Sequence, residues 1–293
     1  MAKPRGWLEW NAEQARNWIR VPGPADDKYT RGVLGMRTGS KDYPGAAVLG
    51  AEAAARTGVG MVRYLGPGRA SDLVLQRRPE VVTVAGRVQA WLLGSGINAD
   101  TRGETVTRAL DAALAEGLPT VVDAGALDRV AGGSDSPRPI VITPHYRELA
   151  ALVNGRNGTT KTVTAGQIAA DPGEWATRAA RNLGVTVLLK GSVTRIATPS
   201  GVRLTVSNAT AWLATAGSGD VLGGILGALL ATNAGRIEAD PDALAALAAT
   251  AALVHARAAG IASAGGPLAA LDVAEAVPAV IRALLAVPTE RKH

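Results

Sequence analysis

Apolar and polar positions along the chain follow two periods that alternate from one stretch to the next. Short runs of consecutive apolar residues, bounded by Gly, Pro or polar residues, predict buried strands. Such runs cover residues 61–65, 90–93, 120–122, 139–142 and 185–189. The stretches between them are rich in Ala and have helical spacing, which predicts helices over residues 45–57, 101–116, 147–153 and 174–183. Because strands that alternate with helices are typical of βαβ units, we expect an α/β fold with a central, mostly parallel sheet flanked by helices.

The pattern changes in the last third of the chain. Residues 195–198 and 203–206 are short strand-like runs joined by Pro199-Ser200-Gly201, which predicts an antiparallel hairpin. Residues 214–285 are almost wholly helical in their spacing. No break in composition and no internal repeat divides the chain. We therefore expect residues 28–293 to form one α/β domain.

The first 27 residues differ from the rest of the chain. They contain three of the six Trp residues, and Trp10, Gln14, Asn17 and Trp18 have the spacing of an amphipathic helix. We expect residues 1–27 to form a helical segment that packs on the domain.

The composition limits how the core is built and which chemistry is available. Hydrophobic residues make up 47% of the 293 residues, but aromatic residues make up only 3%, and Phe is absent. Ala, Val and Leu must therefore fill the core, which requires the helices and the sheet to pack closely over small side chains. The absence of Cys excludes disulfides, thiolate metal sites and cysteine nucleophiles, and it fits a reducing compartment.

Neither a membrane span nor a secretory signal is recognisable in the sequence. The longest uncharged apolar run, residues 221–231, is shorter than the roughly 20 residues that a span needs. A second Ala-rich stretch, residues 243–262, carries His255 and Arg257 and is interpreted as a buried helix. The start of the chain lacks the continuous apolar stretch of a signal peptide. We expect a soluble, cytoplasmic protein without membrane association.

The net charge of +6 raises the question of an anionic partner. Lys and Arg are scattered along the chain, and no aromatic residues alternate with them as a stacking platform for nucleic acid requires. We therefore expect no nucleic-acid partner and interpret the positive charge as suited to an anionic small-molecule substrate.

The strongest candidate for chemistry is a Gly-rich turn before a predicted helix, which reads Thr215-Ala216-Gly217-Ser218-Gly219-Asp220. Small side chains leave the backbone amides of such a turn accessible, and the positive end of the helix adds to them, which makes an anion-binding site. Asp220 would lie beside a bound phosphate, where a carboxylate is suited to take a proton from an attacking hydroxyl. The alternative is structural: Asp220 is a helix N-cap, and the glycines that follow it are helix-packing positions.

Two further motifs follow predicted strands. Lys190-Gly191-Ser192-Val193-Thr194 combines bare amides, two hydroxyls and an ammonium group that could hold the phosphates of a nucleotide. Thr143-Pro144-His145 leaves His145 at the carboxyl end of a strand, with Pro144 placed to start a helix. The alternatives are an ordinary strand-to-turn junction for the first motif and a structural His for the second.

Three other features complete the set. Asp123 follows a strand in the equivalent place, and we interpret it as a helix cap, with an approach to Mg²⁺ or substrate as the alternative. The small-residue turns at residues 39–45 and 94–96 allow a ligand to come close to the backbone.

The three His residues lack zinc-site spacing, no Walker A lysine motif occurs, and the turn at 94–96 lacks the third Gly of a dinucleotide fingerprint. These absences argue against a zinc metalloprotease, a P-loop protein and a dehydrogenase.

Taken together and in this order, the motifs resemble the ribokinase-like superfamily, and more closely its ADP-dependent (S)-NAD(P)H-hydrate dehydratase family. The resemblance extends from about residue 43 to the C-terminal helices. The Tyr-Pro-Gly-Ala and Thr-Pro-His elements favour the dehydratases over the vitamin-precursor kinases of the superfamily. The most specific elements are Tyr-Pro-Gly-Ala at 43–46, Arg-Pro-Glu-Val at 78–81, Thr-Pro-His at 143–145, Leu-Lys-Gly at 189–191 and Ala-Gly-Ser-Gly-Asp-Val-Leu at 216–222.

The resemblance implies a reaction and a set of contacts. Such enzymes dehydrate the S form of hydrated NADH or NADPH and convert ADP to AMP and phosphate, with Mg²⁺ as cofactor. Asp220 is implied as the catalytic base, and a homo-oligomer as the assembly. Fusions with an epimerase domain occur in the family, and because this chain has no room for one, we expect a separate NAD(P)H-hydrate epimerase to act alongside it. Nucleotide contacts are expected at Lys190, Gly191, Ser192, Val193, Thr194, Ala216, Gly217, Ser218 and Gly219, and substrate contacts at Ala46, Gly96, His145 and Asp220.

The sequence departs from the family pattern at three places. Residues 33–40 stand where a Val-rich strand and two glycines are usual, residues 94–98 replace Gly-Pro-Gly-Leu-Gly, and Ala216 stands where Gly is common. The first two departures affect the substrate contacts more than the phosphate site. Two other functions remain open: a kinase of the same superfamily that phosphorylates a hydroxymethylpyrimidine- or hydroxyethylthiazole-type vitamin precursor with ATP, and a nucleotide-binding protein without catalysis.

Overall fold

The strands of the protein form one sheet. The structure is a computed structural model, and it describes residues 6–130, 138–155 and 162–286. Within these residues nine strands pair in the order β1-β9-β8-β7-β6-β5-β4-β2-β3, and only β8 runs antiparallel to its neighbours. The strands are β1 (Leu8–Glu9), β2 (Val33–Arg37), β3 (Met61–Tyr64), β4 (Ala90–Leu93), β5 (Thr120–Val122), β6 (Ile140–Ile142), β7 (Thr186–Leu189), β8 (Thr194–Ala197) and β9 (Arg203–Val206).

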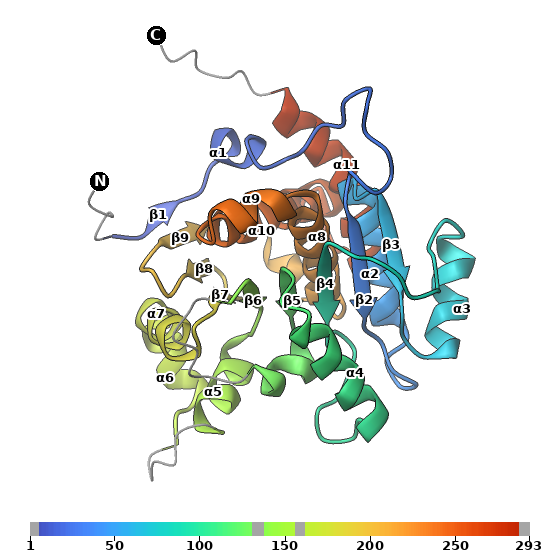
Figure 1. The fold of residues 1–293 in the computed structure, drawn as a ribbon. Helices are drawn as coiled ribbons and strands as arrows, with labels where there is room; N and C mark the ends of the chain where they lie inside the picture. The colour runs from blue at the N-terminus through green and yellow to red at the C-terminus, as the bar shows by residue number, and fades with distance from the viewer. Residues whose placement is uncertain (1–5, 131–137, 156–161, 287–293) are drawn as a thin grey trace.

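Helices cover both faces of this sheet (Figure 1). Helices α2, α8, α10 and α11 pack on one face, with α1, α3 and α9 at its margins, and α4 to α7 cover the other face. This arrangement confirms the expected α/β fold with a mostly parallel sheet flanked by helices. The α-helices are α1 (Ala12–Arg16), α2 (Gly45–Thr57), α3 (Gly68–Arg77), α4 (Glu104–Ala115), α5 (Tyr146–Asn154), α6 (Ala165–Ala170), α7 (Pro172–Leu183), α8 (Ser218–Thr232), α9 (Ala234–Ala239), α10 (Ala243–Ser263) and α11 (Ala270–Leu285), and the 3-10 helices are η1 (Ala124–Arg129) and η2 (Ala211–Leu213).

The side chains of each strand alternate between the two helical layers. In β4, Trp91 and Leu93 belong to the core cluster under α4 to α7, whereas Ala90 and Leu92 belong to the cluster under α2, α8 and α10. All four side chains are buried. A strand that is covered on both faces has no solvent-facing side chains, so its sequence does not alternate between apolar and polar residues. This explains why the central strands appear as short continuous apolar runs.

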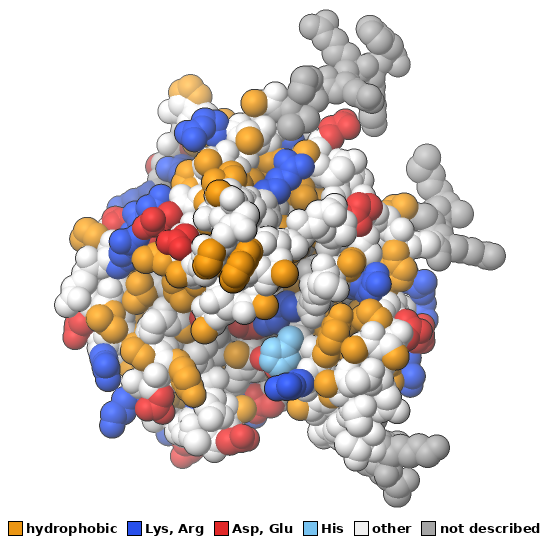
Figure 2. All heavy atoms as spheres, turned by 180° about the vertical axis from the view of Figure 1, so that it is seen from behind, with side chains coloured by type: hydrophobic (Ala, Val, Ile, Leu, Met, Phe, Trp, Pro, Cys, Tyr) orange, Lys and Arg blue, Asp and Glu red, His pale blue; other side chains and the backbone are white. Residues whose placement is uncertain are grey.

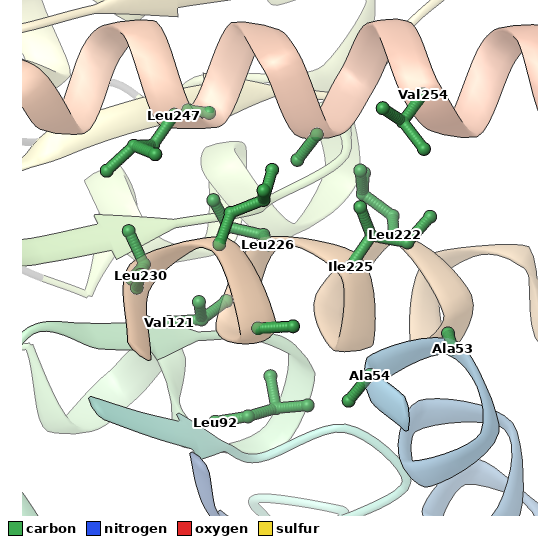
Figure 3. Packing of buried hydrophobic residues seen from close by; sticks show 14 of the residues in the cluster. Ala53, Ala54, Leu92, Val121, Leu222, Ile225, Leu226, Leu230, Leu247 and Val254 are labelled. Atoms are coloured by element: carbon green, nitrogen blue, oxygen red, sulfur yellow. The ribbon is translucent and has the colours of Figure 1, made fainter. Parts of the chain in front are cut away.

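Helix α8 is enclosed by the sheet, α2 and α10. Figure 3 shows its apolar side chains between Leu247 and Val254 of α10 on one side and Leu92 of β4 on the other. Small residues allow α2 to approach α8 closely, because a Cβ atom at Gly224 would lie 2.2 Å from the carbonyl oxygen of Gly50. Gly224 therefore serves helix packing. This agrees with the structural alternative for the glycines that follow Asp220.

The predicted elements are all present, and some further elements were not predicted. The five strands, the antiparallel hairpin and the four helices occur where the pattern places them, with ends that shift by at most three residues. Strand β2 is not apparent in the pattern because Gly35 and Arg37 interrupt its apolar run. Gly35 is needed there, since a Cβ atom would lie 2.4 Å from the ring of Trp91 in the neighbouring strand. Helices α3 and α6 and the two-residue strand β1 were also not predicted.

The N-terminal segment contributes a strand as well as a helix. Strand β1 pairs in parallel with β9, and α1 spans five residues. The indole N–H of Trp10 donates to the hydroxyl of Thr250 in α10 at 3.2 Å, and the guanidinium carbon of Arg236 lies 3.6 Å from the ring centre of Trp18. These contacts hold the described part of the segment against the C-terminal helices. The division of the chain at residue 27 stays a prediction.

Helix α10 is the only helix in the described residues that is long and apolar enough to cross a membrane. Within its most apolar window, 83% of the residues are buried inside the protein. It packs between α8 and α11 and borders strands β7, β8 and β9. Its apolar composition therefore serves the core, in agreement with the interpretation of this stretch as a buried helix.

Charged side chains are mixed over the surface. On the face in Figure 2, Lys and Arg are spread among Asp and Glu and form no single basic patch. A nucleic acid would need a continuous basic surface to follow its phosphates. The view agrees with the scattered basic residues of the sequence, and the absence of a nucleic-acid partner stays a prediction.

A fully buried carboxylate joins α2 to α3. Glu52 of α2 is 0% exposed and forms ion pairs with Arg56 at 2.5 Å, Arg77 at 3.2 Å and Arg78 at 2.5 Å. Arg77 also pairs with Glu275 of α11. Burial alone would raise the pKa of Glu52, but hydrogen bonds from the three guanidinium groups hold it at about 2. Arg78, the first residue of the Arg-Pro-Glu-Val element, therefore has a structural role.

Replacing Glu52 by Ala should lower the free energy of unfolding by about 3 kcal/mol or more, because the three guanidinium groups lose their shared partner. Glu80→Ala is the matched control, since this carboxylate is 57% exposed and pairs with Arg78 at 3.4 Å. Its loss should cost less than about 1 kcal/mol. Urea denaturation at neutral pH measures both values, and equal costs would contradict the role assigned to Glu52. Because the pKa of Glu52 is lowered, its contribution should be complete above about pH 4.5 and disappear as the pH falls through about 2.

Candidate functional site

The candidate motifs meet at one edge of the sheet. Strands β2, β4, β5, β6 and β7 are parallel, so their carboxyl ends lie on the same side, which we call the carboxyl edge. Asp123 follows β5 directly, His145 follows β6 after two residues, and Lys190 follows β7 directly. Open parallel sheets bind their ligands at this edge.

The turn before α8 presents backbone amides at the carboxyl edge. Gly217 is the N-cap of α8 and has a φ of +86°, in the left-handed region that favours glycine. A Cβ atom at Gly217 would also lie 2.5 Å from the side chain of Leu49. The helix begins at Ser218, and the first amides of a helix have no acceptor within it. The turn and the positive helix end therefore have the geometry that suits an anion, and the anion site itself stays a prediction.

Asp220 is not the N-cap of α8. It is the third residue of the helix, and no side chain caps the helix at Gly217. Its Oδ2 atom lies 3.9 Å from the position that a Cβ atom at Gly217 would take, so the carboxylate stands beside the turn. The structural alternative that made Asp220 the cap is therefore wrong. The carboxylate remains available for chemistry on a ligand held by the turn.

Asp123 is the centre of a buried hydrogen-bond network. Its Oδ1 atom accepts from the hydroxyl of Thr143 at 2.7 Å and from the ammonium group of Lys190 at 3.0 Å. Its Oδ2 atom accepts from the hydroxyl of Ser95 at 3.1 Å. Asp123 precedes η1, but its side chain makes no cap hydrogen bond. Asp123 is therefore the N-cap of η1 by position, but its carboxylate joins the ends of four strands and does not cap the helix.

The charges of Asp123 and Lys190 act on Asp220. The pKa of Asp220 is raised from 3.8 to about 7, first by burial and then by the negative charge of Asp123, while Lys190 acts in the opposite direction. Burial alone would lower the pKa of Lys190, but the carboxylates, Asp123 foremost, raise it above its ordinary value. At neutral pH the site thus holds a cation beside a carboxyl group that is close to half ionised, which is the range suited to a general base.

Lys190 connects the two predicted phosphate motifs. Its Nζ atom lies 3.5 Å from the position that a Cβ atom at Gly219 would take, and its backbone N–H donates to the carbonyl of Pro144 at 2.9 Å. Residues 191–193 form the turn between β7 and β8, and Thr194 begins β8. Gly191 and Ser192 are exposed. The structure therefore brings the ammonium group next to the first turn of α8, with the β7–β8 turn beside it.

His145 is the N-cap of α5. Its Nδ1 atom accepts from the backbone N–H of Glu148 at 3.1 Å, and the Glu148 carboxylate accepts from the backbone N–H of His145 at 2.8 Å. Because Nδ1 is an acceptor, the neutral ring carries its proton on Nε2. The side chain is 52% exposed. Pro144 precedes the cap and does not start the helix as expected, since α5 begins at Tyr146.

Ala46, in the first turn of α2, lies next to Gly96, in the loop after β4. Gly96 has a φ of +68°, and a Cβ atom there would lie 2.4 Å from the Cβ of Ala46. One helical turn further along α2, a Cβ atom at Gly50 would lie 3.6 Å from the carbonyl oxygen of Asp220. The expected substrate contacts Ala46 and Gly96 are therefore placed next to the start of α8.

The described residues contain no group of three or more His, Asp or Glu side chains arranged to hold a metal ion. Asp123 is the carboxylate at the carboxyl edge that lies closest to Lys190, and three donors already occupy its oxygens. A carboxylate can accept about four hydrogen bonds, so one position is left. This donor set fits Mg²⁺ only if most of its ligands are phosphate oxygens and water, as is usual for Mg²⁺ on a nucleotide.

Some residues of the site were not identified from the sequence. Ser95 and Thr143 were included only as parts of motifs, yet both donate to Asp123. Glu148 was not singled out, and it lies 3.7 Å from the Lys190 ammonium group. Hydroxyl residues directly after several strands were the signal that could have found the first two. His255 of α10 was also missed: burial lowers its pKa to about 4, so it is a neutral residue beneath the turn that contains Ser218.

A family model described as NAD(P)H-hydrate dehydratase matches residues 34–278. The chain belongs to this family. The ADP-dependent (S)-NAD(P)H-hydrate dehydratase of Neisseria meningitidis serogroup B is 33% identical over 228 residues, which cover 72% of this chain and 73% of that protein. The bifunctional NAD(P)H-hydrate repair enzyme of Mycobacterium tuberculosis is 45% identical over 222 residues, which cover 73% of this chain and 44% of that protein. The chain thus spans about half the length of the bifunctional relatives that it matches.

Solved structures show that this member of the NAD(P)H-hydrate dehydratase family has the ribokinase-like fold. The ADP/ATP-dependent NAD(P)H-hydrate dehydratase from Bacillus subtilis, co-crystallised with ATP/Mg²⁺, has a TM-score of 0.81 at 24% identity and covers 96% of this chain and 100% of its own. A ribokinase-like superfamily protein from Enterococcus faecalis has a TM-score of 0.78 at 19% identity and covers 97% of this chain and 98% of its own. The expected family and fold are confirmed.

Asp220→Asn should stabilise the ligand-free dehydratase-family protein at alkaline pH. Because the pKa of Asp220 is raised from 3.8 to about 7, the folded state binds this proton more tightly than the unfolded state, and stability falls as the pH rises between these values. The variant lacks this loss, so it should be more stable than the unchanged protein by about 2 kcal/mol near pH 8 and nearly equal to it near pH 4. The value at pH 8 is smaller than the full pKa shift implies because the carboxyl group is partly exposed to solvent. Denaturation at both pH values measures the difference. A variant with the same offset at both would contradict the raised pKa.

Proposed function

We propose that the chain dehydrates the S form of hydrated NADH or NADPH with ADP as co-substrate, and releases NAD(P)H, AMP and phosphate. The observation that carries this proposal is the position of Asp220, a carboxyl group with a pKa of about 7 in the first turn of an anion-binding helix and beside Lys190. The family supports the choice of substrate, because its relatives are named for the hydrated cofactor. In chemical terms the reaction is that of a carbon–oxygen lyase in metabolite repair.

The nucleotide is proposed to lie between the β7–β8 turn and the turn before α8. Lys190 offers the only ammonium group that the described residues place against the first turn of α8, and the amides there are unpaired within the helix. The phosphates of ADP need such a combination of a cation and amide donors. The contacts proposed are Lys190, Gly191, Ser192, Val193, Thr194, Ala216, Gly217, Ser218 and Gly219.

The nicotinamide end of the hydrate is proposed to lie against the neighbouring loops. Ala46 and Gly96 bring two backbones close together without side chains that would block a ring, and they stand beside the start of α8. His145 follows β6 at the same carboxyl edge. Its Nε2 atom, which carries the proton of the neutral ring, takes no part in the cap of α5. The hydroxyl of the hydrate would then face Asp220.

The chemistry follows from the poor leaving ability of hydroxide. Asp220 accepts the proton of the ring hydroxyl while its oxygen attacks the terminal phosphorus of ADP, and AMP leaves. The amides of Ala216 to Gly219 donate to the charge that develops on the phosphoryl oxygens. The carbon–oxygen bond then breaks, phosphate leaves with the electron pair, and the lone pair of the ring nitrogen compensates. Loss of a proton from the neighbouring carbon restores the dihydropyridine ring.

Mg²⁺ is proposed to accompany the phosphates, and the B. subtilis dehydratase of the same fold was co-crystallised with ATP/Mg²⁺. Asp123 is the side chain that fits such an ion, through the one position that its hydrogen bonds leave. When bound, the ion would neutralise part of the charge on the phosphates. Asp123 also orients Lys190 through the 3.0 Å ion pair, whether or not an ion is bound.

The setting of the reaction follows from the same proposal. A repair enzyme acts where NADH and NADPH are used, so we infer a cytoplasmic location. We also infer a homo-oligomer and a separate NAD(P)H-hydrate epimerase that supplies the S form. Hydrated NAD(P)H and ADP are the partners that the site itself explains.

The direct test is to add the pure protein to hydrated NADH with Mg²⁺ and ADP and to follow the absorbance of the dihydronicotinamide ring. We expect a rise that depends on nucleotide and that yields AMP and phosphate in equal amounts. Asp220→Asn should lower turnover on the order of 10²–10⁴-fold, while the affinity for ADP changes little. A stable phosphate ester as the product would favour the vitamin-precursor kinase, and nucleotide binding without turnover would favour a non-catalytic protein.

The pH dependence of kcat/KM gives a second test. Because Asp220 acts as a base and its pKa is about 7, the rate constant should be highest above pH 7 and fall about ten-fold per pH unit below it. Initial rates at limiting hydrate and saturating ADP, from about pH 5.5 to 8.5, measure this profile. A profile without a decline toward acid pH would show that Asp220 is not the base.

A further inference from the structure

The order of the strands changes direction between β2 and β4. From β2 the chain continues to β3 on one side of it, then crosses back to β4 on the other side and proceeds through β5, β6 and β7 away from it. The connections after β2 and β4 therefore diverge at the carboxyl edge. In open parallel sheets, ligands bind in the crevice that such a change of direction creates.

A pocket of about 380 Å³ occupies this crevice. Its walls come from the segments that follow β2, β3 and β4 and from one face of α4. The volume lies in the range of pockets that bind small molecules, about 300–1,000 Å³. None of the nucleotide or nicotinamide contacts proposed above lines it. The proposed reaction therefore leaves this space without an occupant.

The pocket adjoins the place proposed for the nicotinamide end of the substrate. Gly39 lines the pocket, and its Cα lies 3.2 Å from the position that a Cβ atom at Gly96 would take. The same position at Gly96 is 2.4 Å from the Cβ of Ala46. The pocket therefore borders the place proposed for the nicotinamide end, on the side of Ala46 and Gly96.

Both apolar and cationic side chains line the pocket. Leu65, Ile97 and Val106 provide apolar surface that suits the face of a purine base. Lys41 also lines the pocket, is exposed and forms no ion pair with the described residues. Arg37 lies with its guanidinium carbon 5.5 Å from the ring centre of Trp91, and no carboxylate of the described residues pairs with it. Such a pocket suits a ligand with an aromatic base and phosphate groups.

The other charged residues of the pocket leave this positive charge in place. Arg102 also lines the pocket but is paired with Asp128 at 2.5 Å, so its charge is compensated. Asp42 is the only carboxylate among the lining residues. Arg37 and Lys41 form no ion pair with the described residues, although the charge of Glu116, outside the lining, acts on Arg37. Among the lining residues the balance is positive, which favours an anionic occupant.

We propose that this pocket binds the adenosine-phosphate arm of the hydrated dinucleotide, with the adenine against α4 and the phosphates toward Lys41. This inference rests on the proposed function, because it places the half of that substrate which does not react. It also gives a use to residues 37–40 and 97–98, which lie where the sequence departs from the family pattern. Binding energy from the remote arm can then hold the reacting hydroxyl at Asp220.

Equilibrium binding of NADPH and of reduced nicotinamide mononucleotide, which lacks the adenosine arm, tests the proposal. Saturating ADP fills the nucleotide site, and neither ligand carries the hydroxyl that reacts. Val106 is 39% exposed, so Val106→Trp can fill the pocket without entering the core. We expect this variant to weaken NADPH binding on the order of ten-fold and to leave mononucleotide binding unchanged. Lys41→Ala should also weaken NADPH binding more than mononucleotide binding, again on the order of ten-fold.

Each variant has a matched control. Arg108→Trp places the same bulk on an exposed position of α4 outside the pocket, and Lys28→Ala removes a lysine near the amino end of β3. Both controls should bind NADPH as the unchanged protein does. If both pocket variants leave the ratio of the two affinities unchanged, the pocket assignment is overturned while the proposed function stands. If the unchanged protein binds neither ligand and does not turn over the hydrate, the proposed function fails, and the assignment fails with it.

Discussion

The carboxylates of Asp123 and Asp220 and the ammonium group of Lys190 lie together at the carboxyl edge. Their unequal pairing determines the proton affinity of Asp220. Lys190 pairs with Asp123 at 3.0 Å, so the repulsion between the carboxylates acts mainly on Asp220. Burial first, and this repulsion after it, raise the pKa of Asp220 to about 7. A phosphate held at the start of α8 would bring more negative charge, which increases the proton affinity of Asp220 at the step where it must accept a proton.

The close approach of backbones is the second condition for this arrangement. Gly224 and Gly50 bring α8 against α2, and Gly217 fits over the side chain of Leu49. Through these contacts the start of α8 lies beside the first turn of α2, which carries Ala46. The composition that fills the core with small residues therefore also brings the proposed catalytic turn and the proposed substrate contacts together. A larger side chain at Gly224 would displace the helix that carries Asp220.

The sequence reveals the fold more completely than it reveals the site. Strands such as β4 are recognisable because both faces are buried and every residue is apolar. Strand β2 is not, because its Gly35 makes room for Trp91 of a strand more than fifty residues away. The same limit applies to Asp123, whose partners Ser95 and Thr143 come from other strand ends. Local pattern predicted a cap there, and only the parallel pairing of β4, β5 and β6 shows that these side chains meet.

The phosphate turn was easier to recognise, because its requirements are local. Gly217 must adopt a positive φ, and the residues up to Asp220 must leave the amides of the first helical turn uncovered. The pocket after β2 and β4 shows the opposite case. Lys41 and Val106 lie far apart in the sequence, and nothing in either segment indicates that they line one space.

The central claim is that the oxygen of the ring hydroxyl attacks phosphorus before the carbon–oxygen bond breaks. Hydrated NADH prepared in ¹⁸O-labelled water carries the label on that hydroxyl. After turnover with unlabelled ADP in ordinary water, mass spectrometry of the released phosphate locates the oxygen. The account predicts one labelled oxygen in each phosphate and unlabelled AMP. Unlabelled phosphate, with the label released as water, would show that the hydroxyl leaves directly and that Asp220 does not act as the proposed base.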